Sequence, residues 1–189
     1  RMERLRADGV EWREIAELLN QKILPGHRWP PIIPLKETDG YSFDSGSAQI
    51  TVSFERLLKN DAVPKIEKLL KEFGADTVEI IGHTDSVPVR QANKTNLDEK
   101  LGPFIQGSLP SDAILVADNA GLGLARAAAV VQILLSDRRL QEVHFIALSA
   151  GQLLRPNGDF AFESSKIGDP LLRRLEVRIR CSKDPCSLR

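Results

Sequence analysis

Apolar and polar residues recur along this chain with two periods, one typical of helices and one typical of strands. Helical spacing predicts amphipathic helices at residues 10–23, 62–73 and 121–135. Alternation or short apolar runs predict strands at residues 35–44, 77–82, 144–149 and 174–180. After residue 34 the order is β-α-β-α-β-β, which predicts an α/β (α+β sandwich) fold with a mixed four-stranded sheet and helices packed on one face.

Local signals refine these elements. Asp61 is expected to cap the helix at residues 62–73, with Pro64 in its first turn, and Gly74 is expected to end it. The last strand alternates most cleanly, so its aliphatic residues are expected to face the core and its charged residues solvent. Residues 77–82 show a similar pattern, which predicts a strand buried mainly on one face.

Residues 1–34 are expected to lie outside the main domain. The helix at residues 10–23 ends before Pro25, and Trp29 to Pro34 forms an extended linker, because proline fixes φ and removes a donor. The apolar stripe of that helix either folds back on the domain, with Trp29 packed there, or pairs with a second copy, since a lone helix of this length is marginal in water. A homodimer is therefore one alternative. The main domain is expected at residues 35–181 and a tail at residues 182–189.

Composition limits the partners. The 189 residues include 26 basic and 26 acidic ones, and this balance argues against a nucleic-acid or anionic-membrane surface. No apolar run is long enough to span a bilayer, and the first residues lack the apolar stretch of a signal peptide. We therefore expect either a cytosolic protein or an excised fragment of an exported or membrane-anchored one.

The two cysteines, Cys181 and Cys186, lie near the end of the chain on either side of a proline turn. A local disulfide, an intermolecular disulfide and two free thiols are the alternatives. A zinc site is not expected, because two cysteines lack the further ligands of a tetrahedral site.

Two motifs carry candidate binding chemistry. Gly82-His83-Thr84-Asp85 ends an apolar strand in a turn that presents a carboxylate. Asn119 to Ala127 opens a helix and presents the guanidinium of Arg126, whose fork fits a carboxylate at a helix end that also favours anions. Asn119 is placed to cap that helix and to donate from its amide. The two fixed charges suit a zwitterion such as the Cα centre of an amino acid, although Asp85 and Arg126 could instead form an internal ion pair.

His83 beside Asp85 suggests catalysis, but no serine or cysteine nucleophile context accompanies it. A structural role is therefore expected, in which His83 hydrogen-bonds the turn. A hydrolase using Asp85 and His83 stays as an alternative that needs a nucleophile or metal. Gly121 and Gly123 do not form a dinucleotide fingerprint, because no strand runs directly into them. No enzyme activity and no cofactor is expected.

The same motifs carry a family resemblance. The chain resembles the OmpA-like C-terminal domain of outer-membrane anchors, peptidoglycan-associated lipoproteins and MotB-type flagellar stator subunits. The four parts of the family pattern are read here at residues 41–48, 82–85, 119–127 and 173–177. The resemblance covers roughly residues 35–180, and Val87-Pro88 after Asp85 is more similar to the stator branch.

The resemblance implies a noncatalytic periplasmic module that binds the diaminopimelate-containing stem peptide of peptidoglycan. Asp85 would accept from the ligand ammonium and Arg126 would bind its carboxylate, with Thr84 and Asn119 beside them and Arg173 as a second cation. The module would anchor a membrane-attached, ion-driven stator-like complex to the cell wall, joined to membrane partner subunits through a missing N-terminal segment. The alternatives are an outer-membrane or lipoprotein anchor and an oligomerisation domain with a degenerate site.

The chain departs from the family pattern at several points. Gly123 stands where the family usually has serine, so one hydroxyl contact is expected to be missing, and Leu172 replaces an asparagine. Residues 86–118 form an insertion much longer than the usual loop and rich in loop-forming residues. This insertion is expected to be a lid, a partner surface or a flexible segment.

Overall fold

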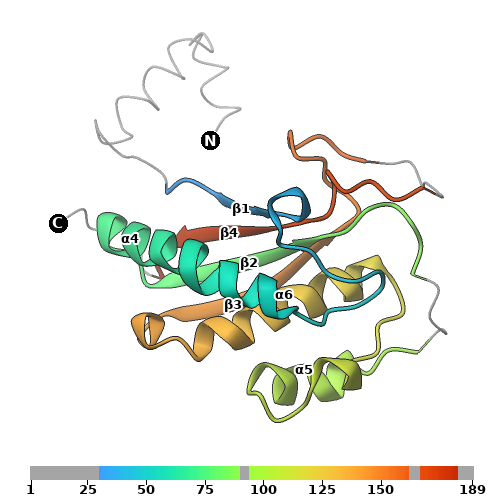
Figure 1. Cartoon of the computed structure of the whole chain (residues 1–189), viewed down its shortest axis with the longest axis horizontal. Helices are drawn as coiled ribbons and strands as arrows, with labels where there is room; N and C mark the ends of the chain where they lie inside the picture. The colour runs from blue at the N-terminus through green and yellow to red at the C-terminus, as the bar shows by residue number, and fades with distance from the viewer. Residues whose placement is uncertain (1–29, 90–93, 162–166, 183–189) are drawn as a thin grey trace, which may run out of the picture.

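A mixed four-stranded sheet forms the centre of the molecule (Figure 1). Its strands, in spatial order, are β1 (Ile33–Lys36), β4 (Arg174–Arg180), β2 (Thr77–His83) and β3 (His144–Gly151). β4 runs antiparallel to β1 and β2, whereas β2 and β3 run parallel. The predicted β-α-β-α-β-β order and mixed sheet are confirmed, with one further helix between β2 and the second long helix.

The computed structural model describes residues 30–89, 94–161 and 167–182. The predicted helix at residues 10–23, Trp29 and Cys186 lie outside these ranges. Cys181, which directly follows β4, is disulfide-bonded, so it is not a free thiol. Within the described ranges, no helix combines the length and apolar character needed to cross a bilayer.

Two long helices share one core with one face of the sheet. The first consists of α3 (Val52–Leu57), a π-helical turn η2 (Leu58–Ala62) and α4 (Val63–Phe73), and the second is α6 (Asn119–Leu135). The main core contains buried side chains from both helices and from β2 and β4, among them Phe54, Ile66, Val78, Ile80, Val130, Leu134, Leu175, Val177 and Ile179. The inward orientation predicted for the aliphatic residues of β4 is confirmed.

The first long helix begins earlier than predicted. It starts after Thr51, whose hydroxyl accepts from the amide of Phe54 at 3.2 Å. It ends at Gly74, which adopts the left-handed conformation (φ 59°) as predicted, because glycine has no Cβ to oppose it.

Asp61 lies inside this helix, so its predicted role as a cap is wrong. Its carboxylate accepts from the hydroxyl of Tyr41 at 3.0 Å and from Lys65 at 2.8 Å. The wider π-helical turn precedes Pro64, which lacks an amide donor and whose ring would crowd the preceding turn of a regular α-helix. The helix thus passes the proline without ending.

β1 begins two residues before the predicted strand and is shorter than predicted, so the linker boundary at residue 34 cuts through it. Pro34 is tolerated because β1 is an edge strand, where a missing donor costs the sheet little. Leu35 is buried in the core opposite Leu175. The 3-10 turn η1 (Glu37–Asp39) follows at once and ends at Gly40 (φ 94°).

The second face of β4 is buried at its first half, contrary to the prediction that its charged residues face solvent, whereas Arg178 and Arg180 are exposed as predicted. Arg174 and Glu176 point away from the helices, yet both are buried. Arg174 donates to the carbonyls of Leu154 and Arg155 at 3.3 Å. The segment after β3 therefore covers this part of β4. β2 is buried on both faces, so the prediction that it is buried mainly on one face is wrong.

Glu176 is the centre of a charge cluster on that face. Its carboxylate accepts from Arg174 and Arg178 at 2.9 Å, and Nε2 of His83 lies 3.3 Å from Oε1. By hydrogen-bond geometry neither ring nitrogen of His83 has a partner among the described residues, so the predicted hydrogen bond to the turn is not formed. The contact with His83 and the bonds from Arg178 and Arg174 hold the pKa of Glu176 well below its ordinary range, although burial acts to raise it.

Glu176→Gln is expected to lower the free energy of unfolding at pH 7 by about 3–5 kcal/mol, because Arg174 would stay buried without its carboxylate. The pKa of Glu176 is depressed in the folded state, so its stabilisation is present above the unfolded pKa of about 4.3 and is lost as the pH falls toward the folded value. Urea unfolding at several pH values measures this, and the difference in stability between the two proteins should begin to shrink as the pH falls below about 4.

The matched control is Glu79→Gln. Glu79 pairs at 3.1 Å with Arg180, whose side chain is 55% exposed. Loss of this ion pair should therefore lower the free energy of unfolding by no more than about 1 kcal/mol. An equal effect of both substitutions, or a Glu176→Gln effect that does not change between pH 7 and pH 3, would contradict the assignment.

The insertion at residues 86–118 contains helix α5 (Leu97–Ile105), so the expectation of loop structure throughout is wrong. α5 packs on α6 around a second, smaller cluster of buried side chains that includes Phe104, Ile114, Val116, Leu122 and Ala125. Asn96 joins the two ends of this unit, since its side chain bonds the carbonyl of Ala113 and the amide of Leu115. The described part of the insertion is thus a packed appendage of α6.

Candidate functional site

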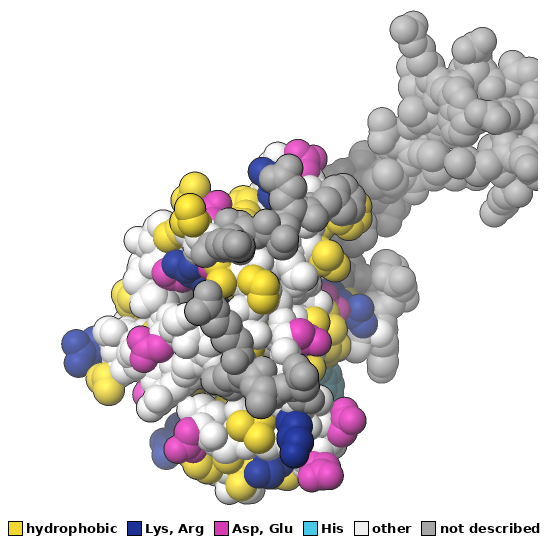
Figure 2. Space-filling view, turned by 90° about the vertical axis from the view of Figure 1, so that its right-hand side faces the viewer, with side chains coloured by type: hydrophobic (Ala, Val, Ile, Leu, Met, Phe, Trp, Pro, Cys, Tyr) yellow, Lys and Arg dark blue, Asp and Glu magenta, His cyan; other side chains and the backbone are white. Residues whose placement is uncertain are grey.

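A cavity of about 690 Å³ opens at one end of the sheet and is lined by all five predicted site residues: Thr84, Asp85, Asn119, Arg126 and Arg173. Figure 2 shows this end of the molecule, where hydrophobic and charged side chains are interspersed. From the insertion, Val87, Pro88 and Val89 line the cavity, but none of its residues from 94 to 118 does. The α5 unit therefore does not form a lid over it.

The sheet register explains why residues distant in sequence meet here. His83 at the end of β2 pairs with Arg174 at the start of β4, so Thr84 and Arg173 are neighbours just beyond the sheet. β1 ends at the same edge, because Lys36 pairs with Arg174, and this places Glu37 next to Arg173.

α6 is brought to the same edge by direct contact between backbones. A Cβ on Gly82 would lie 2.0 Å from the carbonyl oxygen of Gly123. A Cβ on Gly123 would lie 2.4 Å from Oγ of Ser149 and 2.9 Å from the carbonyl oxygen of Gly82. That Gly123 leaves one hydroxyl contact of the family pattern missing stays a prediction, but this glycine also has a packing role. It is required for the close packing of α6 on β2.

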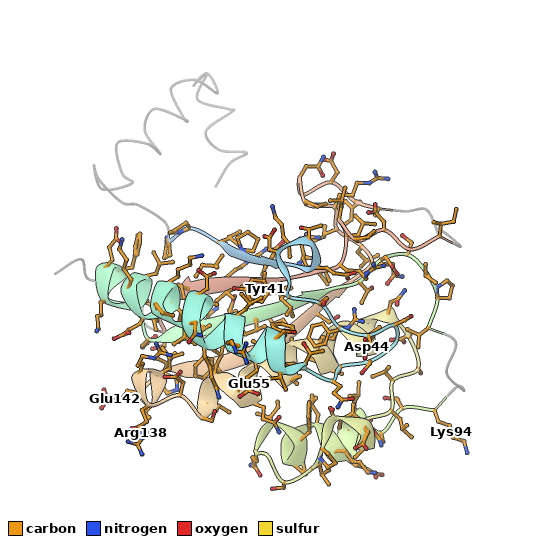
Figure 3. The ribbon with its side chains drawn as sticks, in the orientation of Figure 1. Tyr41, Asp44, Glu55, Lys94, Arg138 and Glu142 are labelled. Carbon is orange, nitrogen blue, oxygen red and sulfur yellow. The ribbon has the colours of Figure 1, made fainter. Side chains whose placement is uncertain are left out.

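Arg126 is a buried cation that has no carboxylate partner within the described part of the chain. Its Nε donates to the carbonyl of Ser47 at 2.9 Å and its Nη2 to that of Asp44 at 3.1 Å, on the loop between β1 and α3 (Asp44 is labelled in Figure 3). Its guanidinium lies 4.9 Å from the ring centre of Phe43. Among the described residues no ion pair includes Arg126, so the alternative of an internal pair with Asp85 is not what the structure shows. Burial lowers the pKa of Arg126 to about 10, and it stays charged at neutral pH.

Asp85 is paired with Arg173 instead. Its Oδ2 accepts from Nη1 of Arg173 at 2.6 Å, and its Oδ1 accepts from the amide of Val87 at 3.1 Å. The remaining nitrogens of Arg173, Nε and Nη2, donate to the carboxylate of Glu37 at 2.5 and 2.7 Å. Glu37, and then Asp85, raise the pKa of Arg173. These bonds use three of the five N–H groups of Arg173, and two carboxylates already compensate its charge, so Arg173 attracts a ligand carboxylate less strongly than Arg126 does.

Glu37 is the site residue that the sequence analysis missed. It lies 136 positions from its partner Arg173, outside every motif of the family pattern, and no periodicity marks it. The only signal in the sequence was the place of Glu37 directly after the first strand. This signal was hidden because the predicted strand at residues 35–44 included Glu37.

Asn119 and Thr84 complete the wall of the cavity. Nδ2 of Asn119 donates to the carbonyls of Asp85 and Val87, at 3.2 and 3.0 Å, and so holds the turn that carries Asp85. The helix cap is Asp118, which accepts from the amide of Gly121 at 2.7 Å, so the predicted cap at Asn119 is wrong. Oγ1 of Thr84 is buried and has no hydrogen-bond partner among the described residues.

His83 lies apart from this arrangement. Its side chain contacts Glu176 on the second face of the sheet and does not line the cavity, whereas Asp85 does. The hydrolase alternative needs Asp85 and His83 to act on one substrate, and this geometry gives it no support.

No protein-family model matches the chain, and no curated protein matches it. Among solved structures, it is similar to a MotB-like protein from Desulfovibrio vulgaris, with 15% identity, a TM-score of 0.44, and 79% of this chain and 74% of that one covered. It is also similar to the periplasmic domain of Helicobacter pylori MotB in two crystal structures, each with 15% identity and a TM-score of 0.46. The alignments cover 84% of this chain and 85% or 80% of those chains.

Proposed function

We propose that the cavity binds the diaminopimelate-type stem peptide of peptidoglycan, without catalysis, through the zwitterionic end of the diamino acid. The observation that carries this proposal is Arg126, a buried guanidinium that lines the cavity and is not ion-paired among the described residues. Asp85 lines the same cavity and offers the opposite charge.

Arg126 is suited to a carboxylate for a physical reason. A buried cation is stable only when its donors are satisfied, and its bonds to the carbonyls of Ser47 and Asp44 use Nε and Nη2. A charge-assisted bond to a carboxylate is roughly twice as strong as a bond to a neutral acceptor. A ligand carboxylate in the cavity would therefore supply the missing counter-charge.

Asp85 is suited to the ammonium of the same centre. The turn that carries its carboxylate is fixed by Asn119, so little ordering is needed on binding. Its side chain is 12% exposed, so it is reached from the cavity but is only weakly screened by water. Thr84, whose buried hydroxyl has no partner among the described residues, lies beside it.

The wider role that we propose rests on the family resemblance of these motifs. The domain would lie in the periplasm and anchor a membrane-attached, stator-like complex to the cell wall. A segment on the N-terminal side would join it to the membrane and to partner subunits, and a homodimer is compatible with this role. An outer-membrane or lipoprotein anchor would use the same cavity, and an oligomerisation domain with a degenerate site would not need it.

Co-sedimentation with insoluble peptidoglycan tests the proposal. The protein should pellet with diaminopimelate-type peptidoglycan and much less with lysine-type peptidoglycan, because lysine lacks the second carboxylate that Arg126 would bind. A protein that stays in the supernatant with both materials would contradict the binding function. Equal pelleting with both would contradict the assignment of the diamino acid.

Asn119→Ala is expected to weaken stem-peptide binding about tenfold, because the turn that carries Asp85 loses two hydrogen bonds of about 1 kcal/mol each. Asp118→Ala is the matched control at the neighbouring position. It removes the cap of α6 and should cost about 1 kcal/mol of stability while leaving affinity unchanged. Calorimetric titration and urea unfolding of both variants measure these effects. If Asp118→Ala weakened binding more than Asn119→Ala, the role given to Asn119 would be wrong.

A further inference from the structure

We infer that Glu37 determines the preference of the cavity for a ligand that carries a primary ammonium group. This inference rests on the proposed function and adds a specificity-determining residue to it. Glu37 lines the cavity, but its carboxylate is turned to Arg173 and not to the space a ligand would fill.

The charges of Glu37, Arg173 and Asp85 set the preference of this side of the cavity. Asp85 is in contact with Arg173 at 2.6 Å, and these two groups alone would form a neutral pair with little attraction for an ammonium group. Glu37 binds the same guanidinium through both carboxylate oxygens. Glu37, Arg173 and Asp85 therefore carry one net negative charge together, beside the positive charge of Arg126.

Without Glu37, the same cavity would hold a neutral Asp85–Arg173 pair, the buried cation Arg126 and the carboxylate of Asp44, which is exposed and screened by water. It would then favour any carboxylate and would not distinguish a ligand that has an ammonium group from one that lacks it. With Glu37, the negative charge lies on the Asp85 side of the cavity and the positive charge on the Arg126 side. This division matches the two charges of an amino-acid centre.

The fold holds Glu37 in this position. The amide of Glu37 donates to the carbonyl of Arg173 at 3.4 Å, and the turn η1 is closed by Gly40, whose amide donates to the carbonyl of Glu37 at 3.0 Å. The side chains of Glu37 and Arg173 are 22% and 25% exposed, so water screens their interaction only partly.

The loop before β4 closes the other side of the cluster. A Cβ at Gly168 would lie 2.8 Å from Nη1 of Arg173 and 3.1 Å from Oδ2 of Asp85, so this backbone packs directly over their contact. A ligand ammonium must therefore approach Asp85 from the cavity, where Arg126 fixes the carboxylate end.

The test uses two peptides that differ in one charge: the diaminopimelate tripeptide and the same peptide with its free side-chain amino group acetylated. The parent should bind the free amine at least roughly tenfold more tightly. Glu37→Gln should lose most of this ratio, that of the affinity for the free amine to the affinity for the acetylated peptide. Its affinity for the acetylated peptide should change by less than about threefold. The double variant Glu37→Gln with Arg173→Gln should regain the ratio, because Asp85 then again carries an uncompensated charge.

A purely structural role of Glu37 predicts different results. Glu37→Gln would then lower the affinity for both peptides equally. Adding Arg173→Gln would lower both affinities further instead of restoring their ratio. Either result would overturn the inference, and urea unfolding of each variant shows whether it is folded. If the parent bound neither peptide, the proposed function itself would be contradicted. Binding by the parent with an unchanged ratio in Glu37→Gln would contradict only the role of Glu37.

Discussion

Replacing Arg126 with methionine is expected to cost about 2–5 kcal/mol of binding free energy for the stem peptide, enough to abolish co-sedimentation with peptidoglycan. The guanidinium is the buried cation that faces the cavity, and methionine keeps much of the length of the side chain without its charge. Calorimetric titration of the tripeptide measures the loss.

Arg126 also holds the carbonyls of Ser47 and Asp44, so the variant must be separated from a misplaced loop. Arg126→Lys serves as the matched control, since it keeps the charge but loses the planar fork, and its affinity should fall between those of the parent and Arg126→Met. Parent-like affinity of Arg126→Met would show that the ligand carboxylate is not bound here. Equal affinities of the two variants would show that charge has no part in binding.

Gly82→Ala is expected to have the largest effect on the fold, a loss of at least about 3 kcal/mol, at the upper end of the range for overpacking. The new Cβ would lie 2.0 Å from the carbonyl oxygen of Gly123. Neither backbone can yield easily, because β2 is a central strand and α6 packs along it. Urea unfolding measures the change in the free energy of unfolding.

Gly102→Ala is the matched control for this substitution. Gly102 lies in α5, and a Cβ there meets nothing within 4 Å. Alanine should therefore change the free energy of unfolding by less than about 1 kcal/mol, because its better helix propensity is offset by the restriction that Pro103 places on the preceding residue. A Gly82→Ala protein within about 1 kcal/mol of the parent would contradict the direct contact between β2 and α6.

Much of the fold follows from local pattern in the sequence. β4 coincides with the predicted strand at residues 174–180, because alternating aliphatic residues on a central strand leave no second interpretation. Gly74 was predictable as a helix end, because its conformation is a local preference of glycine. Thr84, Asp85, Asn119 and Arg173 meet at one cavity because each lies at or next to the end of a predicted element, whereas Arg126 lies inside α6 and reaches the cavity through the close packing of α6 on β2.

The rest depends on contacts between distant segments, which no local pattern reports. Arg174 and Glu176 have the spacing of a solvent-facing row, and they are buried only because the segment after β3 folds over them. Glu37, directly after β1, belongs to the site only because it forms an ion pair with Arg173, directly before β4. α5 was missed because Gly102 and Pro103 interrupt its helical pattern, and its stability comes from packing on α6.

The central claim, that the stem peptide binds in this cavity, is tested most directly by nuclear magnetic resonance of the isotopically labelled protein during titration with the diaminopimelate tripeptide. The largest shifts are expected at the side-chain Nε–H of Arg126 and at the backbone amides that line the cavity, those of Asp44, Ser45, Gly46, Thr84, Asp85, Val87 and Val89. Amides of α5 should not move, since this helix does not line it. Absence of any shift at saturating peptide, or shifts confined to α5 and the outer face of α6, would contradict the claim.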